Sequence, residues 1–346
     1  MASSISTHER RKEAHLRICL DYVVQASNVS TGFEHFRLEH QALPGIDWEE
    51  IDTSVYLFGK KLSAPIVISP MTGGCSLGAR INRNLAQAAH RLGLAMGIGS
   101  QRVAILHPEL EDSFRVRDVA PDILLFGNLG AVQLNAGFGL DECRRAVDMI
   151  GADALCLHLN AMQEIHQRGG DLKFRGVLER ISEVCSELRS PVMVKEVGWG
   201  ISKDAARALV ASGVDAIDVS GAGGTSWFVV EQLSKGIEQE EVLRSPFASW
   251  GIPTAESLRQ VVEVAGNLPV IASGGIRNGV DAAKALAMGA SAVGVALPLL
   301  KPAAESAKAV VDVLERLIQE LRIAMFGIGA VDISSLRRTR HLVKIT

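Results

Sequence analysis

The stretch 269–298, PVIASGGIRNGVDAAKALAMGASAVGVALP, contains the pattern that decides the fold. A short apolar run ends in a glycine-rich loop, helical spacing follows over 280–288, and a second apolar run occupies 292–298. Two strands joined through a helix need a crossover connection, so they lie parallel in one sheet. Both runs are apolar throughout rather than alternating, which is typical of strands covered on both faces.

The same unit recurs along the chain. Eight apolar runs occupy residues 65–69, 95–99, 123–129, 154–160, 191–197, 216–221, 269–275 and 292–298. Helical spacing separates them at 79–92, 140–150, 173–188, 203–212, 255–265 and 280–288. Eight such units that close on themselves predict an α/β fold, a (β/α)8 TIM barrel. An open doubly wound parallel sheet is the alternative.

Two segments fall outside the repeat. Residues 1–64 are expected to form an N-terminal extension that contributes to the active site, and residues 65–346 to form the barrel. A long insertion follows strand six, from about 222 to 253, and contains Glu231. Connections of this length are usually functional or disordered, so we expect a lid over the barrel mouth.

Composition excludes several classes of protein. The chain has 346 residues, 47% of them hydrophobic, which is enough for a large core and rules out a disordered chain. Its 36 basic and 39 acidic residues leave a net charge of −3, so no nucleic-acid or membrane-surface partner is expected. No stretch reaches the roughly 18–20 apolar residues of a membrane span, and no signal peptide is evident, which favours a cytoplasmic location.

The five cysteines are scattered without CxxC spacing, which speaks against a disulfide framework and a zinc site. We interpret them as small buried hydrophobic residues. They are Cys19, Cys75, Cys143, Cys156 and Cys185.

Loops at the carboxyl ends of barrel strands carry the chemistry of such folds. The seventh run ends in Ser273-Gly274-Gly275-Ile276-Arg277, and the eighth ends in Ala296-Leu297-Pro298. Adjacent glycines and a helix N-terminus suit a phosphate, although a tight connection without a ligand is the alternative.

Small and polar residues also follow the first three runs. These are Met71-Thr72-Gly73-Gly74, Gly99-Ser100-Gln101-Arg102 and Asn128. Such residues permit a flat aromatic ring to lie across the mouth. Together with the phosphate loops they indicate a nucleotide-like cofactor such as FMN.

Charged and polar residues at the fourth and fifth runs are further candidates. Lys195 stands inside an apolar run, where it either pairs with Glu196 or another barrel carboxylate, or stabilises negative charge on a reduced flavin. In an extended strand His158 and Asn160 point to the same side. Glu164 in the loop above is suited to Mg²⁺, or is simply a solvated charge.

The N-terminal run 9–15 mixes charges of both signs, as a solvated helical face does. If the segment folds over the mouth, Arg11 and Lys12 meet phosphate oxygens. The loop 220–227, SGAGGTSW, follows the sixth run and is therefore not a Rossmann fingerprint, but its glycines and hydroxyls suit a cofactor.

Together these motifs resemble the type 2, FMN-dependent isopentenyl-diphosphate isomerases. The resemblance runs from residue 11 to about 300, and its most specific segments are HLNxxQE at 158–164 and GGTSW at 223–227. It implies the interconversion of isopentenyl and dimethylallyl diphosphate in isoprenoid biosynthesis. Reduced FMN would act as acid and base, with Mg²⁺ and NADPH.

The resemblance also implies roles for individual residues. Glu164 would bind Mg²⁺, and, from the chemistry of the reaction, we expect Gln163 and Glu231 to relay the second proton. The implied substrate-binding residues are Arg11, Lys12, Ser100, Gln101, Arg102, His158, Asn160 and Gln163. The implied FMN-binding residues are Met71, Thr72, Gly73, Ser100, Asn128, Lys195, Ser220, Thr225, Gly274, Gly275, Arg277, Ala296 and Leu297.

Other functions remain as alternatives. An FMN-dependent 2-hydroxy-acid oxidoreductase shares the barrel, but expects a His-Gly-Gly-Arg type sequence where this chain has Gly-Ala-Gly-Gly-Thr at 221–225. An inosine-monophosphate-dehydrogenase-like enzyme needs a cysteine in that loop, which has none. A non-catalytic flavin- or phosphate-binding protein is also possible, since fold does not determine function. The expected partners are a small diphosphate and further copies of the chain, in a tetramer or larger homo-oligomer.

Overall fold

A computed structural model describes residues 7–25 and 28–345, so residues 1–6 and 26–27 of the predicted N-terminal extension lie outside the described residues. Eight parallel strands form a closed barrel in the order β10-β11-β4-β5-β6-β7-β8-β9. They are β4 (Ile66–Ile68), β5 (Ala95–Gly97), β6 (Leu125–Gly130), β7 (Ala154–His158), β8 (Val192–Lys195), β9 (Ala216–Asp218), β10 (Val270–Ala272) and β11 (Ala292–Val295). Because β11 pairs with β4, the predicted TIM barrel is confirmed and the open sheet is excluded.

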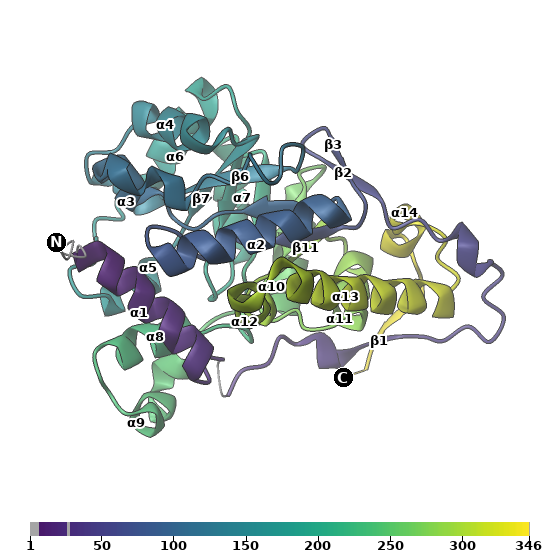
Figure 1. Cartoon of the computed structure of the whole chain (residues 1–346). Coiled ribbons are helices and arrows are strands. Elements are labelled where there is room, and N and C mark those ends of the chain that lie inside the picture. The colour runs from purple at the N-terminus through teal and green to yellow at the C-terminus, as the bar shows by residue number, and fades with distance from the viewer. Residues whose placement is uncertain (1–6, 26–27, 346) are drawn as a thin grey trace.

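The predicted helices surround the barrel (Figure 1). They are α2 (Ser76–Leu92), α4 (Leu140–Ile150), α6 (Val177–Glu187), α7 (Lys203–Ala211), α10 (Thr254–Ala265) and α11 (Gly279–Ala287). Helix α6 begins four residues later than the predicted 173–188, because Gly176 adopts a left-handed conformation with φ of 83° and interrupts the helix there. After the last strand come α12 (Leu297–Glu305), α13 (Ala307–Gly327) and α14 (Ile333–Arg337).

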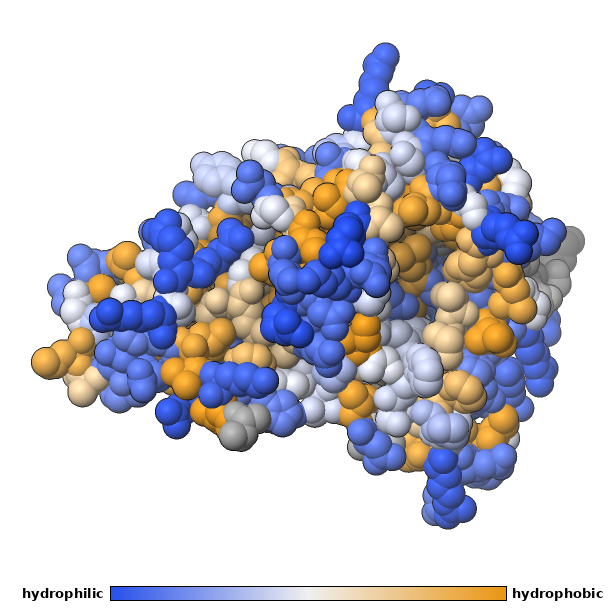
Figure 2. Space-filling model, turned by 180° about the vertical axis from the view of Figure 1, so that it is seen from behind, coloured by the Kyte–Doolittle hydropathy of each residue, from blue (hydrophilic) through white to orange (hydrophobic). Residues whose placement is uncertain are grey.

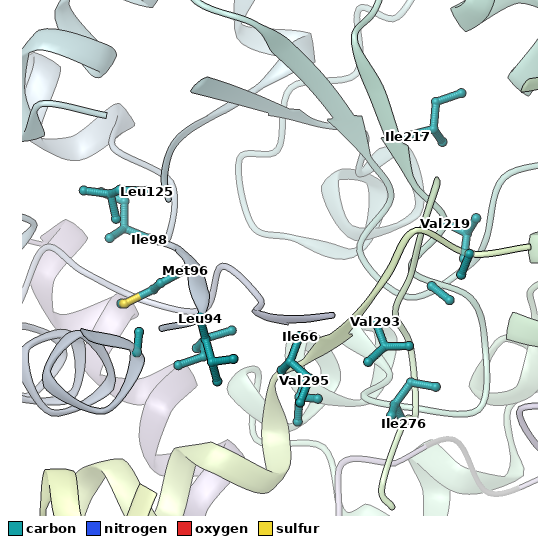
Figure 3. Close-up of a cluster of buried hydrophobic side chains, with 14 of the residues drawn as sticks. Ile66, Leu94, Met96, Ile98, Leu125, Ile217, Val219, Ile276, Val293 and Val295 are labelled. Atoms are coloured by element: carbon teal, nitrogen blue, oxygen red, sulfur yellow. The ribbon is translucent and has the colours of Figure 1, made fainter. Parts of the chain in front are cut away.

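Alternate strand residues fill two separate hydrophobic layers. Ile66 on β4 and Met96 on β5 point outward against the helices, and Figure 3 shows part of this outer layer. Val67 and Ala95 point into the barrel instead. This alternation explains why the strands are apolar throughout, since both of their faces are covered.

A hairpin closes the amino-terminal end of the barrel. It consists of β2 (Val55–Leu57) and β3 (Lys60–Leu62), and its Leu57 and Leu62 pack into the interior cluster. Phe58 meets Phe126 edge-on, with 5.8 Å between ring centroids. The lower barrel is therefore packed core, and a ligand can enter only at the carboxyl ends of the strands.

Four helices gather at that carboxyl end (Figure 1). Helix α1 (Thr7–Asp21) contacts α8 (Trp227–Ser234), which in turn contacts α5 (Ala161–His166) and α9 (Gln239–Arg244). The insertion after β9 is thus largely helical. Phe228 and its neighbours on α8 are buried in a separate hydrophobic cluster with Val24 and Trp199, which accounts for the folding of this segment.

None of the described helices is both long and apolar enough to cross a membrane. Figure 2 shows hydrophilic and hydrophobic side chains interleaved over one face of the molecule. All five cysteines are free, and Cys75, Cys143 and Cys156 are buried as predicted, whereas Cys19 and Cys185 are only half-buried.

Candidate active site

The side chains inside the barrel change from apolar to polar at the carboxyl ends of the strands. Cys156, Met193 and Ala216 belong to the apolar interior. Two residues further along each strand, and so on the same face, stand polar groups. Around the barrel these are Ser69, Asn128, His158, Lys195, Asp218 and Ser273. Buried polar groups are costly unless they find partners, so this layer marks the functional end of the barrel.

A cavity lies above this polar layer and brings most of the predicted site residues together. Helix α1, the loops that follow the strands, and the first residues of α12 contribute its walls. The predicted residues that line it are Arg11, Lys12, Met71, Thr72, Ser100, Arg102, Asn128, His158, Asn160, Gln163, Glu164, Lys195, Ser220, Thr225, Gly274, Gly275, Arg277, Ala296 and Leu297.

Three predicted residues lie outside this lining. The Gln101 side chain is completely buried, where its Nε2 donates to the carbonyl of Ala146 (2.8 Å) and its Oε1 accepts from the Asn128 N–H (2.8 Å). Gln101 therefore supports Asn128 from behind. Gly73 packs closely against the ring of Phe114, so that a Cβ added to Gly73 would lie 2.0 Å from the nearest ring atom. Glu231 does not line the cavity itself but is hydrogen-bonded to Gln163, which does.

Several unsatisfied groups on the cavity wall fit a bound flavin nucleotide. The buried oxygens Ser69 Oγ, Thr72 Oγ1 and Asn160 Oδ1 have no hydrogen-bond partner among the described residues. Each such group costs about 1–3 kcal/mol if it stays unpaired, so a polar ligand is favoured there. Helix α12 begins without a side-chain cap, which leaves its N-terminus open to an anion.

The two glycine-containing loops, around Gly274-Gly275 and around Gly221 and Gly223, pack backbone against backbone with no side chain between them. Gly274 and Gly275 have φ of 99° and 84°. A Cβ on Gly274 would lie 2.2 Å from the Gly221 carbonyl, and one on Gly275 would lie 2.8 Å from the Gly223 carbonyl. Their amides therefore line a narrow cradle of the kind that binds phosphate, and together with the polar oxygens the residues fit FMN.

Lys195 is buried at the end of β8 and lines the cavity. Its Nζ donates to the main-chain oxygen of Glu196 rather than to the carboxylate. That carboxylate accepts the N–H groups of the three residues that follow it, among them Val197 and Gly198 at 2.7 Å each. Burial raises the pKa of Glu196 to about 7. The alternative of a Lys195–Glu196 carboxylate ion pair is thus not what the structure shows.

His158 is held as a neutral imidazole. Burial, with the Lys195 charge beside it, lowers the pKa of His158 to about 3. The Asn128 Nδ2 donates to the carbonyl of Ile98 (2.9 Å), so its Oδ1 faces His158 Nδ1 at 2.8 Å. We therefore assign the ring hydrogen to Nδ1, which leaves Nε2 as an acceptor.

Asn160 lies beyond the end of β7, at the N-cap of α5, rather than on the strand as expected, but it and His158 both line the cavity at the barrel mouth. Its Nδ2 donates to Glu164 Oε1 (2.9 Å). Glu164 is only 4% exposed and is therefore not a solvated loop charge. Its Oε2 accepts from the Asp171 N–H (2.7 Å) and from Gln167 Nε2 (3.3 Å).

Glu164 is the one carboxylate among the described residues that line the cavity, whose lining also includes the cations Arg102 and Lys12. Among the described residues there is no group of three or more His, Cys, Asp or Glu side chains that could hold a metal ion. A single carboxylate fits Mg²⁺ when substrate phosphate oxygens and water complete its shell. Burial and the neighbouring Arg11 lower the pKa of Lys12 to about 8, so its ammonium persists at neutral pH.

A chain of polar side chains leads from the cavity to the insertion. Gln163 Nε2 donates to Glu231 Oε1 (3.0 Å), and Glu231 Oε2 lies 3.5 Å from His15 Nε2. Burial opposes ionisation of Glu231, but His15 and Gln163 hold its pKa below the usual value. The predicted pair Gln163 and Glu231 is therefore in contact, with His15 as a third member.

Sequence reasoning gave no role to three residues of this site, Ser69, His15 and Asp218, and it considered Ser273 only as part of the phosphate loop. Asp218 carries a readable signal, because it is a charge in an apolar run, as Lys195 is. His15 meets Glu231 only through tertiary folding, since 216 residues separate them in the chain.

Known proteins resemble the chain in sequence and in structure. A family model described as FMN-dependent dehydrogenase matches residues 14–107 and 144–344. A protein of Nostoc sp. named isopentenyl-diphosphate delta-isomerase is 48% identical over 337 residues, covering 97% of this chain and 96% of that protein. One of the same name from Stutzerimonas stutzeri is 50% identical over 333 residues, with 96% of each covered.

Solved structures with low sequence identity share the fold. A lactate oxidase from Pediococcus acidilactici superposes with a TM-score of 0.66 at 19% identity, covering 97% of this chain and 93% of that one. A mandelate oxidase mutant gives a TM-score of 0.61 at 21% identity, with 99% and 93% covered. These likenesses extend to the architecture alone.

Proposed function

The chain belongs to the isopentenyl-diphosphate delta-isomerases, within the FMN-dependent dehydrogenase family, and from this premise we propose that it interconverts isopentenyl and dimethylallyl diphosphate with FMN, Mg²⁺ and NADPH. The observation that carries the proposal is one cavity. It combines a backbone cradle suited to a flavin phosphate with a basic pair, Arg11 and Lys12, suited to a second phosphate group.

Moving a double bond in an unactivated alkene needs a proton at one carbon and the loss of a proton at another. Reduced FMN supplies, when bound, a ring nitrogen of suitable acid–base character. In this chain Gly274, Gly275 and the start of α12 would hold its phosphate. Asn128 and Lys195 would hold the ring, with the Lys195 ammonium compensating negative charge.

The diphosphate would bind at the outer part of the cavity. Arg11, Lys12 and Arg102 bring positive charge there from α1 and from the start of α3 (Arg102–Leu106). Glu164 would hold Mg²⁺ against the phosphates. Binding energy from this remote, non-reacting group fixes the apolar end of the substrate in the cavity.

The polar chain that starts at Gln163 would manage the second proton. Gln163 lines the cavity, and its amide is oriented by donation to Glu231 and by the Asn160 amide, 3.3 Å from Gln163 Oε1. Glu231 is an anion beside His15, so it can accept a proton and return it.

The function is tested by anaerobic incubation of the FMN-loaded protein with isopentenyl diphosphate, Mg²⁺ and NADPH in heavy water. We expect the allylic isomer, with deuterium in both isomers, by NMR. A flavin-loaded, reduced preparation that exchanges no deuterium would contradict the proposal. Oxidation of lactate or mandelate by the same preparation would point to the 2-hydroxy-acid oxidoreductase alternative.

The metal role is tested with Glu164→Gln. The amide keeps the size of the side chain but loses its charge, so we expect the Mg²⁺ concentration for half-maximal rate to rise by about tenfold or more. Glu183→Gln, on the exposed face of α6, is the matched control and is expected to titrate as the unmodified protein does. An unchanged Mg²⁺ titration in a folded Glu164→Gln protein would remove the assignment.

A further inference from the structure

Asp218 is a buried charged residue that the steps above do not use. It ends β9 at 2% exposure, and its Cα is in register with that of Lys195 on β8. Its Oδ1 accepts from Ser273 Oγ (2.6 Å) and from the Ser220 N–H (3.2 Å). One carboxylate thus joins the residues that follow two neighbouring strands, β9 and β10, and lies level with Lys195 on a third, β8.

The residues that Asp218 joins all face the cavity. Ser220, Ser273 and Lys195 line it, whereas Asp218, level with Lys195 in the same polar layer, is not among the lining residues. Ser220 has a φ of 35°, a left-handed conformation that is unusual for a residue other than glycine. The hydrogen bond from its N–H to Asp218 holds this conformation and so aims the loop 220–225.

The carboxylate also sets the charge of the polar layer. Burial raises the pKa of Asp218, while the Lys195 ammonium and the Ser273 hydroxyl act in the opposite direction. Both hydrogen bonds to Oδ1 come from donors, the Ser220 N–H and the Ser273 hydroxyl, and an ionised carboxylate accepts both. The Lys195 charge is therefore not isolated beneath the cavity but is opposed by a nearby anion.

We propose that Asp218 is a positioning residue for the flavin, which fixes Ser220 and Ser273 and tempers the positive charge of Lys195 that a reduced, negatively charged flavin would meet. The inference rests on the proposed function, because it needs FMN in this cavity. A reduced flavin carries more negative charge than an oxidised one, so the Asp218 carboxylate disfavours the reduced form relative to the oxidised form.

The test is the two-electron midpoint potential of FMN bound to Asp218→Asn. This variant keeps the shape of the side chain and the Oδ1 acceptor but removes the charge. We expect the preference of the site for reduced over oxidised FMN to rise at least tenfold, which is a shift of about 30 mV to more positive potential for a two-electron couple. Reductive titration of the holoenzyme against a reference dye measures it.

Ser273→Ala is the matched variant, because it removes a hydrogen bond and no charge. We expect this variant to bind FMN at least threefold more weakly. Its preference for reduced over oxidised FMN should stay within twofold of that of the unmodified protein. A folded Asp218→Asn holoenzyme with unchanged potential overturns the inference. If Asp218→Asn fails to fold, Ser273→Ala decides, and unaltered FMN affinity in that variant overturns it. Failure of the unmodified protein to bind FMN at all would instead sink the proposed function.

Discussion

Lys195→Met is expected to lower kcat/KM for the isomerisation by about a hundredfold or more, because a single preorganised donor at a site of developing charge is worth about 10²–10³ in rate. Lys195 is buried in the polar layer and faces the cavity. Methionine fills similar space but leaves the reduced flavin without a compensating cation. Steady-state kinetics with added FMN measure the effect.

The same variant is expected to move the flavin potential in the negative direction, opposite to Asp218→Asn, since it removes a positive charge. Lys195→Arg retains the positive charge, so we expect it not to shift the flavin potential in the negative direction. Lys308→Met, on the exposed face of α13, is the control for the loss of a lysine away from the site. Wild-type kcat/KM in a folded Lys195→Met holoenzyme would refute the assignment.

Gly274→Ala is expected to destabilise the protein and to abolish FMN retention. The residue has φ of 99°, and a Cβ there would lie 2.2 Å from the Gly221 carbonyl and 2.8 Å from Thr254 Oγ1. Left-handed backbone costs about 1–2 kcal/mol for an ordinary residue, and overpacking costs about 1–3 kcal/mol more. Neither clashing partner can move freely, because Thr254 itself donates to the Gly274 carbonyl.

Gly151→Ala is the control for this prediction. Gly151 also has positive φ, 59°, but a Cβ there would meet only Arg117 at an ordinary 3.7 Å. We expect it to cost about 1 kcal/mol, the backbone term alone, and to leave the FMN content unchanged. Urea unfolding and the flavin absorbance of the purified protein measure both effects. Equal losses in the two variants would contradict the cradle interpretation.

The barrel could be predicted because its signal is local. Each unit carries its own apolar run and its own helical spacing, and the helix at 140–150 was bounded correctly because glycines stand at both of its ends. The insertion after β9 lacks such a signal. Trp227–Ser234 becomes a helix because Val24 and Trp199 bury its apolar face, and that contact joins distant parts of the chain.

The residues of the candidate site also divide into those that could be predicted from the sequence and those that could not. Residues at the carboxyl end of a strand, such as Asn128 on β6 and Lys195 on β8, are predictable from the rule that barrel chemistry gathers there. Gln101 shows the limit of the rule, because its position after β5 says nothing of the direction of its side chain. Asp218 shows an unused signal, since the reasoning that selected Lys195 from an apolar run applies equally to it.

The hairpin that closes the barrel base has a consequence for how the chain matures on the ribosome. Both caps of the cylinder, α1 above and β2–β3 below, are synthesised before any of the walls they seal. The segment that follows α1 pairs its Phe36 with Lys344, near the far end of the polypeptide. Such sequence-distant pairings form slowly, so the early segment stays exposed during translation and depends on late synthesis for its burial.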